Sequence, residues 1–180
     1  MKIIAFAGMP FSGKSEAVKI AKEMNIPVVR MGDMVWEEVK RQGLEINDEN
    51  VGRVANMMRK SHGMDIWAKR TVDKILKLKN TNKLVIDGVR NFEEINFFQK
   101  MLGASFVVVA VQVSDETRYK RAMNRGREDD SMDIELIKER DRRERGWGLD
   151  NVIASADIVV SNEAGIGKFR NEIKEILSKI

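Results

Sequence analysis

Short apolar runs alternate along this chain with segments whose apolar residues recur at helical spacing. The first run, residues 3–7, reads Ile-Ile-Ala-Phe-Ala and ends at Gly8, which is typical of a parallel strand covered on both faces. Similar β-rich runs occupy residues 28–29, 84–86, 106–113 and 157–160. This alternation predicts a three-layer α/β fold with a parallel sheet of about five strands and right-handed crossovers.

The stretch between the second and third predicted strands has no strand pattern of its own. Residues 48–79 predict two helices broken near Gly63, with His62 at a helix end. We therefore expect a helical insertion over about residues 33–79, where an acceptor site would lie. The length of the chain favours a single domain over residues 1–180.

Composition narrows the chemistry. The chain has no cysteine and one histidine, which excludes disulfide scaffolds, thiolate chemistry and the usual zinc ligand sets, so a metal here would be oxygen-ligated, such as Mg²⁺. The net charge is +4, with 32 basic and 28 acidic residues interspersed, which argues against a nucleic-acid partner. Neither a signal peptide nor an apolar stretch of membrane-spanning length is present, so we expect a cytoplasmic protein without a membrane partner.

The strongest motif lies between the first strand and a helix that is expected to begin near Lys14. It reads Gly8-Met9-Pro10-Phe11-Ser12-Gly13-Lys14-Ser15 and fits the phosphate-binding loop (P-loop) pattern G-x-x-x-x-G-K-[ST]. Its glycines let backbone N–H groups surround phosphate oxygens at a helix N-terminus. Lys14 is expected to reach the β and γ phosphates of a nucleoside triphosphate, and Ser15 to bind Mg²⁺. Glu16, directly after the loop, is counted with the ATP site.

A carboxylate follows the third strand. Asp87, in Leu84-Val85-Ile86-Asp87-Gly88, comes at the carboxyl end of a buried strand, the edge at which open parallel sheets bind ligands. Beside a phosphate-binding loop, Asp87 is predicted to hold Mg²⁺ directly or through water. A plain Asp-Gly turn is the alternative.

Arginines concentrate in the last third of the chain. Arg118, Arg121 and Arg125 have the spacing of one helix face, where an anionic partner would relieve their mutual repulsion. Residues 126–146 are strongly charged and bracketed by Gly126 and Gly146, which predicts a short mobile lid. An exposed helical hairpin is the alternative.

These motifs together resemble the nucleoside monophosphate kinase group of P-loop NTPases. Met31-Gly32-Asp33-Met34 and Asp87-Gly88-Val89-Arg90 are similar to two motifs of adenylate kinases, and the spacing of Arg121, Arg125 and Arg127 is similar to their entry into the lid. The ending from Ala156 to Asn162 looks like that of dephospho-coenzyme A kinases. The chain also resembles an archaeal family of adenylate-kinase-related proteins, in its overall length and its Asp-Gly-x-Arg pattern.

The resemblance implies roles for particular residues. Arg121 would pack on the donor base and Asn162 would lie near the donor adenine. Arg125 would grip the donor phosphates. The lid residues Arg127 and Arg140 would reach the transferred group. The acceptor would be bound by Gly32, Asp33 and Arg90. Apart from the resemblance, Arg53 and Arg59 on the inserted helices are candidates for binding an acceptor phosphate, with simple surface solvation as the alternative.

The sequence departs from the resemblance on the acceptor side. No proline precedes Arg90, which therefore comes one residue nearer the strand, and Trp36 stands where adenylate kinases have an arginine. By their helical spacing, Trp36 and Trp67 are expected in the core, with packing on a base as the alternative. Asp33 is expected either to cap the following helix or to act on the acceptor.

We expect an enzyme, namely a kinase that uses ATP and Mg²⁺ and phosphorylates a small molecule, with a nucleoside monophosphate such as AMP as the favoured acceptor. In this reading Lys14, Arg125, Arg127 and Arg140 stabilise the transferred charge. One alternative is a hydroxyl kinase of the dephospho-coenzyme A type with Asp33 as general base. The other is a nucleotide-binding switch that hydrolyses ATP slowly. The sequence leaves the donor base and the oligomeric state open.

Overall fold

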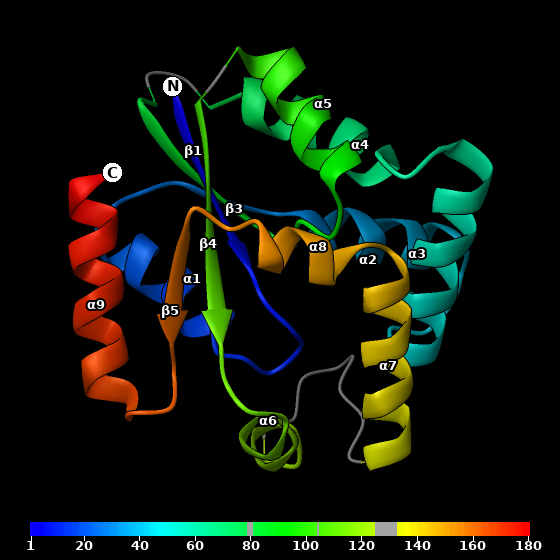
Figure 1. Ribbon diagram of the computed structural model, residues 1–180. Coiled ribbons are helices and arrows are strands. Elements are labelled where there is room, and N and C mark those ends of the chain that lie inside the picture. The colour runs from blue at the N-terminus through cyan, green and yellow to red at the C-terminus, as the bar shows by residue number, and fades with distance from the viewer. Residues whose placement is uncertain (79–80, 104, 125–132) are drawn as a thin grey trace.

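The computed structural model describes residues 1–78, 81–103, 105–124 and 133–180. In these residues, five parallel strands form one sheet in the order β2-β3-β1-β4-β5 (Figure 1). The strands are β1 (Lys2–Ala7), β2 (Val28–Arg30), β3 (Lys83–Asp87), β4 (Ser105–Gln112) and β5 (Ile158–Ser161). The predicted five-stranded parallel sheet is confirmed, because each apolar run is a strand.

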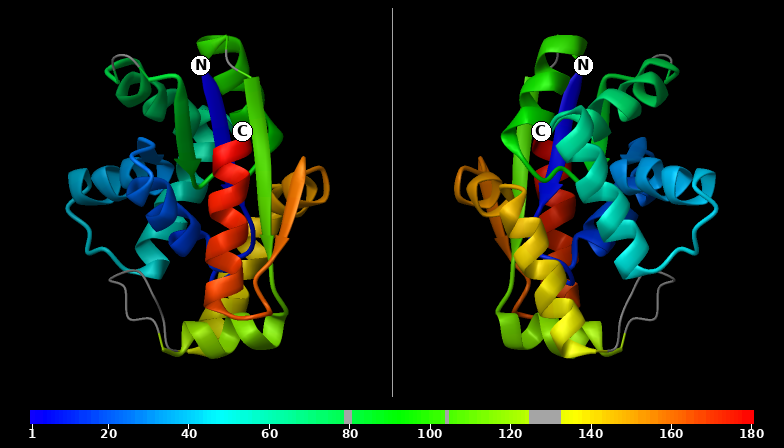
Figure 2. Two further views of the ribbon diagram at one scale, coloured as in Figure 1. Left: turned by 90° about the vertical axis from the view of Figure 1, so that its left-hand side faces the viewer. Right: turned by 90° about the vertical axis from the view of Figure 1, so that its right-hand side faces the viewer.

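Helices cover both faces of this sheet. One face carries α1 (Lys14–Glu23) and α9 (Ile166–Lys179). In the left view of Figure 2, α9 lies in front of the sheet. The other face carries α2 (Met31–Arg41), α3 (Asp48–His62), α4 (Ile66–Leu76), α5 (Phe92–Leu102) and α8 (Leu149–Ala154). Side chains alternate along β1, so Ile4 and Phe6 join the core under α1 and α9, while Ile3 and Ala5 join the other core. These two cores explain why residues 3–7 of β1 are all apolar.

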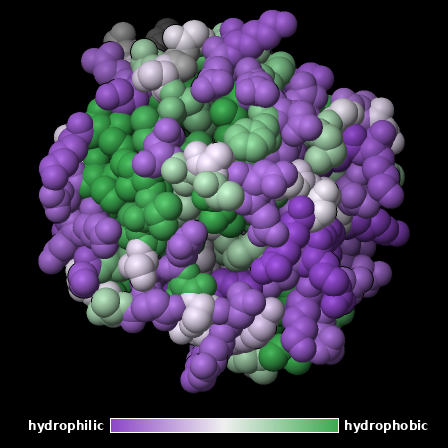
Figure 3. All heavy atoms as spheres, in the orientation of Figure 1, coloured by the Kyte–Doolittle hydropathy of each residue, from purple (hydrophilic) through white to green (hydrophobic). Residues whose placement is uncertain are grey.

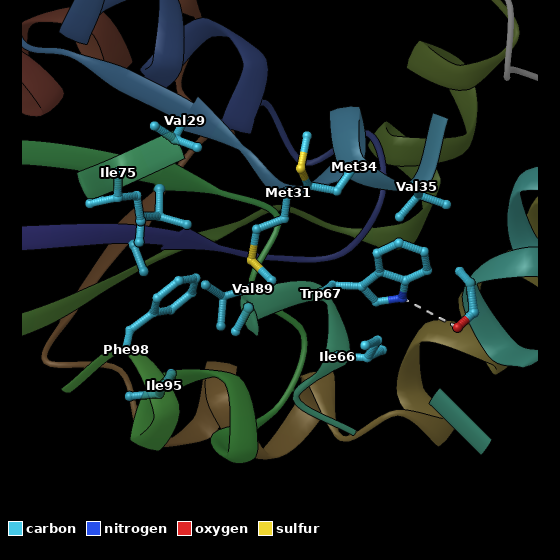
Figure 4. Packing of buried hydrophobic residues seen from close by; sticks show 14 of the residues in the cluster. Val29, Met31, Met34, Val35, Ile66, Trp67, Ile75, Val89, Ile95 and Phe98 are labelled. Carbon is cyan, nitrogen blue, oxygen red and sulfur yellow. Dashed lines mark hydrogen bonds between the residues drawn. The ribbon is translucent and has the colours of Figure 1, made fainter. Parts of the chain in front are cut away.

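The insertion consists of α2, α3 and α4. Trp67 of α4 is buried in its core, where the indole N–H donates to the carbonyl of Ala55 at 3.3 Å (Figure 4). The helix α3 ends at His62, and Gly63 follows with φ of 97°, which confirms both the break and the helix-end position of His62. The division of the chain into one domain with an insertion at about 33–79 and a lid at about 126–146 stays a prediction.

Two more helices flank the carboxyl edge of the sheet. They are α6 (Asp115–Ala122) and α7 (Ile134–Gly146), and α7 is the described part of the predicted lid. The right view of Figure 2 shows α7 beside α3. Ile137, Asp141 and Glu144 of α7 are buried, so this helix packs on its neighbours with one face. The surface in Figure 3 is mostly hydrophilic, with apolar side chains gathered on the side where β4 and β5 lie.

Candidate active site

The loop from Gly8 to Ser15 leaves the end of β1 and leads into α1, which begins at Lys14. Gly8 and Gly13 have φ of 148° and 111°, conformations that favour glycine. A Cβ on Gly13 would lie 2.1 Å from Nδ2 of Asn162, so only glycine lets the loop pass this side chain. The local sequence therefore produces a tight turn that brings backbone N–H groups to the N-terminus of α1.

Lys14 is buried inside this turn. Its ammonium donates hydrogen bonds to the carbonyls of Gly8 at 2.6 Å and Met9 at 2.9 Å. Burial, followed by the positive charge of Arg90, lowers the pKa of Lys14 to about 7, against the opposing negative charge of Glu144. An anion bound at the loop would favour the charged form of this lysine.

A cavity of about 460 Å³ extends from the loop to the insertion. The part that we call the loop side is lined by the loop together with Arg121 and Asn162. The part that we call the insertion side is lined by Trp36, Val51, Ala55, Arg59 and Trp147, among others. Arg90, Arg140 and Glu144 also line the cavity, and all three influence the pKa of Lys14, so they connect the two sides.

Ser15 and Asp87 share this cavity and also line a smaller one of about 230 Å³. Within the described ranges, no group of three or more histidine or acidic side chains is arranged to hold a metal ion. Mg²⁺, however, takes few protein ligands and keeps water and substrate phosphates as the others. The hydroxyl of Ser15 and the carboxylate of Asp87 therefore fit a magnesium ion that arrives with a nucleotide.

The arginines of α6 have different surroundings. Arg121 donates to the carbonyls of Ser12 at 3.2 Å and Asn162 at 2.8 Å, and it lines the cavity. The amide of Asn162 donates to the same Ser12 carbonyl at 2.9 Å. These contacts hold two of the predicted ATP-binding residues against the loop.

Arg118 corrects the prediction of a shared anion-binding face. This arginine is buried and donates to Asp141 at 2.6 and 3.1 Å, to Asp115 at 2.6 and 3.1 Å, and to the carbonyl of Pro10 at 3.0 Å. Its donors already have protein acceptors. Arg118 therefore supports the loop from behind, whereas Arg121 faces the cavity.

Arg59 and Arg90, predicted to bind the acceptor, both line the cavity and share one carboxylate. Arg59 donates to Glu94 at 2.8 Å, and the backbone N–H of Arg90 donates to the other oxygen of Glu94 at 2.7 Å. The guanidinium of Arg59 lies 4.2 Å from the centre of the Trp147 ring. Burial lowers the pKa of Arg59, and the charge of Glu94 opposes this effect.

Asp33 and its neighbours follow β2. Gly32 lines the cavity, whereas Asp33 is absent from the lining residues and lies 3.3 Å from Nη1 of Arg30. The N-cap of α2 is Arg30 and Asp33 is the third residue of the helix, so the predicted capping role of Asp33 is wrong. Trp36 also differs from its prediction, because it is half-buried and lines the cavity, whereas Trp67 is in the core as predicted.

The helix α7 closes the insertion side. Arg140 lies 3.3 Å from Asp48 at the start of α3, and Arg143 donates to the same carboxylate at 3.1 and 3.2 Å. A Cβ on Gly52 would lie 2.3 Å from Cζ of Arg143, so α3 carries a glycine where this guanidinium rests. Sequence reasoning found Arg140 but missed Arg143 and Glu144. Their spacing from Arg140, at i+3 and i+4 on one helix face, was the available signal.

Three further residues were predicted to act on ATP, namely Arg125, Arg127 and Glu16. Arg125 and Arg127 lie outside the described residues. Glu16 lines the cavity and forms an ion pair with Arg170 of α9.

Comparison with known proteins shows to which family the chain belongs. It matches the family of AAA domains over residues 7–138. It is 46% identical to a UPF0200/UPF0201 protein of Archaeoglobus fulgidus, over 100% of this chain and 56% of that protein. It is 44% identical to a UPF0200 protein of Methanosarcina barkeri, over 99% of this chain and 95% of that protein. The chain belongs to the UPF0200 family. It spans little more than half the length of the Archaeoglobus relative.

The fold of this UPF0200 protein is also found among solved structures. Shikimate kinase from Aquifex aeolicus matches with a TM-score of 0.53 and 21% identity, over 98% of this chain and 96% of that one. The match confirms the three-layer P-loop kinase fold that the resemblance implied. In the part of the UPF0200 chain that is described, no helix is long and apolar enough to cross a membrane.

Proposed function

We propose that this protein is an ATP-dependent phosphotransferase that phosphorylates a small anionic acceptor. The observation that carries this proposal is a continuous cavity that extends from the phosphate-binding loop to the insertion. Two ligands bound at its two sides would meet near Lys14, Arg90 and Arg140. Phosphoryl transfer requires mainly this positioning and neutralisation of charge.

On the loop side, ATP would be bound by its phosphates at the backbone of residues 8–15. Lys14 would exchange its carbonyl partners for phosphate oxygens, and Ser15 and Asp87 would hold the Mg²⁺. The metal supplies charge neutralisation on the phosphates when it is bound. Arg121 and Asn162 already form the wall of the loop side and would bound the donor nucleoside.

On the insertion side, we favour a nucleoside monophosphate such as AMP. Trp36 and Trp147 line this side, each with a guanidinium group against its ring. The positive charges of Arg59 and Arg90 suit an acceptor phosphate. The hydroxyl-kinase alternative needs a general base within reach of the acceptor. Asp33 is not among the residues that line the cavity, and its carboxylate is paired with Arg30, which favours the monophosphate over that alternative.

The test is ATP turnover with a panel of acceptors. ADP formation would be measured with AMP, the other nucleoside monophosphates, dephospho-coenzyme A, and no acceptor. Stimulation by a monophosphate is the expected result, stimulation only by dephospho-coenzyme A would favour the hydroxyl kinase, and turnover that no acceptor changes would favour the ATPase switch.

The first predicted variant belongs to this assay. Lys14→Ala is expected to lower turnover by roughly 10² to 10³, the usual effect of removing one group that stabilises transition-state charge. Its fold should survive, because Lys14 donates only to the loop itself. Lys174→Ala, at an exposed position of α9, is the matched control. Undiminished turnover in the Lys14 variant would contradict the proposed function.

A further inference from the structure

One carboxylate occupies the junction between the two sides of the cavity. Glu144 of α7 lines the cavity with a side chain that is only 5% exposed. Its Oε2 lies 2.8 Å from Nε of Arg90, and its Oε1 accepts a hydrogen bond from Nε of Arg140 at 3.2 Å. Glu144 therefore joins an arginine that follows β3 to an arginine of α7.

Its electrostatic surroundings also include the phosphate-binding loop. Burial alone would raise the pKa of Glu144, but the charges of Arg90, Arg140 and Lys14 together lower it to about 2. The negative charge of Glu144 in turn raises the pKa of Lys14. The cations expected to surround a transferred phosphoryl group thus already surround a carboxylate.

A second buried carboxylate of the same helix shows what a purely structural role looks like. Both oxygens of Asp141 accept hydrogen bonds from Arg118, and Asp141 does not line the cavity. Oε2 of Glu144, by contrast, has no aligned hydrogen bond from any described residue, although it lies close to Arg90. The contact of Oε2 with Arg90 is therefore an ion pair without an aligned hydrogen bond, unlike the contacts of Asp141 with Arg118.

We propose that Glu144 is a positioning residue that also competes with the transferred phosphoryl group for the same cations. This rests on the proposed function. The carboxylate holds Arg90 and Arg140 in place, and it competes with phosphate oxygens for these arginines and for Lys14. An anion bound beside Glu144 is repelled by its charge, so Glu144 weakens the binding of phosphate in this cavity.

Binding of inorganic phosphate, measured by calorimetry in the absence of nucleotide and acceptor, tests this directly. Glu144→Gln removes the charge and keeps the shape, and it is expected to raise phosphate affinity at least roughly tenfold. Glu144→Asp keeps the charge and should bind phosphate about as weakly as the wild type. Glu139→Gln, at an exposed position of α7, is the matched control and should change nothing. Thermal melting would confirm that each variant is folded.

Two results would overturn the proposal. One is unchanged or weaker phosphate binding in folded Glu144→Gln. The other is an equal gain in Asp48→Asn, which removes one charge from the same cavity and would show that only net charge matters. Because phosphate binding needs no turnover, failure of the kinase assay would leave this result interpretable. If Glu144→Gln does not fold, the proposal is tested by Glu144→Asp, and a large gain in phosphate affinity there contradicts it.

Discussion

The loop side and the insertion side of the cavity are formed by different kinds of chemical group. On the loop side, the carbonyl of Ser12 accepts hydrogen bonds from Arg121 and Asn162, and Lys14 donates to two carbonyls of its own loop. On the insertion side, arginines of α3 and α7 meet carboxylates and a tryptophan from other elements. Backbone groups dominate the first side and side chains dominate the second.

This difference separates the binding of phosphates, which is general, from the recognition of an acceptor, which is specific. Backbone N–H groups and one lysine bind the phosphates of any nucleoside triphosphate, so the loop side carries no information about the acceptor. The insertion side consists of side chains whose identity and spacing can change between proteins of one fold. In the proposed function, the choice of acceptor would therefore depend on residues such as Arg59, Trp36 and Trp147.

The largest effect is expected at the support of the loop side. Arg118→Met removes the guanidinium that donates to Pro10, Asp115 and Asp141. The buried Asp141 loses its cation and keeps the hydrogen bond from the hydroxyl of Tyr119. The expected loss is about 3–5 kcal/mol in the free energy of unfolding, measured by urea denaturation. Arg121→Met, one turn further along α6, is expected to lose under about 1.5 kcal/mol and to weaken nucleotide binding instead. Similar losses in both variants would contradict the distinction between these two arginines.

Much of the loop side could be predicted from the sequence. Eight consecutive residues specify the loop, and the apolar run before them specifies the strand that positions it. Asp87 could be placed at the same edge of the sheet, because the carboxyl ends of parallel strands meet there. Local sequence was sufficient because these groups depend on backbone geometry.

Roles that depend on contacts between distant elements could be predicted only in part. Arg118 and Arg121 are equivalent by helical spacing, and contacts with Pro10 and Asp141, both distant in sequence, distinguish Arg118. Trp36 and Trp67 have similar apolar neighbours, yet one lines the cavity and the other is core. Contacts between helices that are distant in sequence decide these roles, and no local pattern encodes them.

The next prediction concerns the frame of the insertion. Glu38 of α2 is buried and accepts hydrogen bonds from Arg41, Gln42 and, across to α4, Arg70. The hydrogen bond from Arg41, followed by those from Arg70 and Gln42, lowers the pKa of Glu38 from 4.5 to about 2, although burial opposes this. Glu38→Gln is expected to cost about 1.5–3 kcal/mol of stability at neutral pH.

The stability loss in Glu38→Gln should depend on pH, because the pKa of Glu38 is lower in the folded protein than in the unfolded chain. Because the folded pKa lies below the unfolded one, the contribution of Glu38 is present above pH 4.5 and is lost as the pH falls through about 2. The difference in unfolding free energy between wild type and Glu38→Gln should therefore shrink over this window. Urea denaturation at a series of pH values measures it, and a difference independent of pH would show that the charge of Glu38 does not support the insertion.

The smallest effect on stability is expected at Gly52. A change there also gives the sharpest test of the difference between the loop side and the insertion side. A methyl group there would overlap the guanidinium of Arg143, which would lose its place against Asp48. The helix itself should tolerate Gly52→Ala, since alanine gains up to about 1 kcal/mol over glycine in a helix interior. The variant is therefore expected to remain folded while the insertion side changes shape.

The expected result is a rise of roughly tenfold in KM for the acceptor, the effect of one lost charge-assisted contact. KM for ATP should stay unchanged, because the backbone of the loop side does not touch Gly52. Gly167→Ala in α9 is the matched control: nothing lies within 4 Å of its added Cβ, so it should gain stability and leave both KM values unchanged. An equal rise of both KM values in Gly52→Ala would show that the two sides respond as one unit. A rise confined to the acceptor would show that side-chain contacts between α3 and α7 shape the acceptor site independently of the loop.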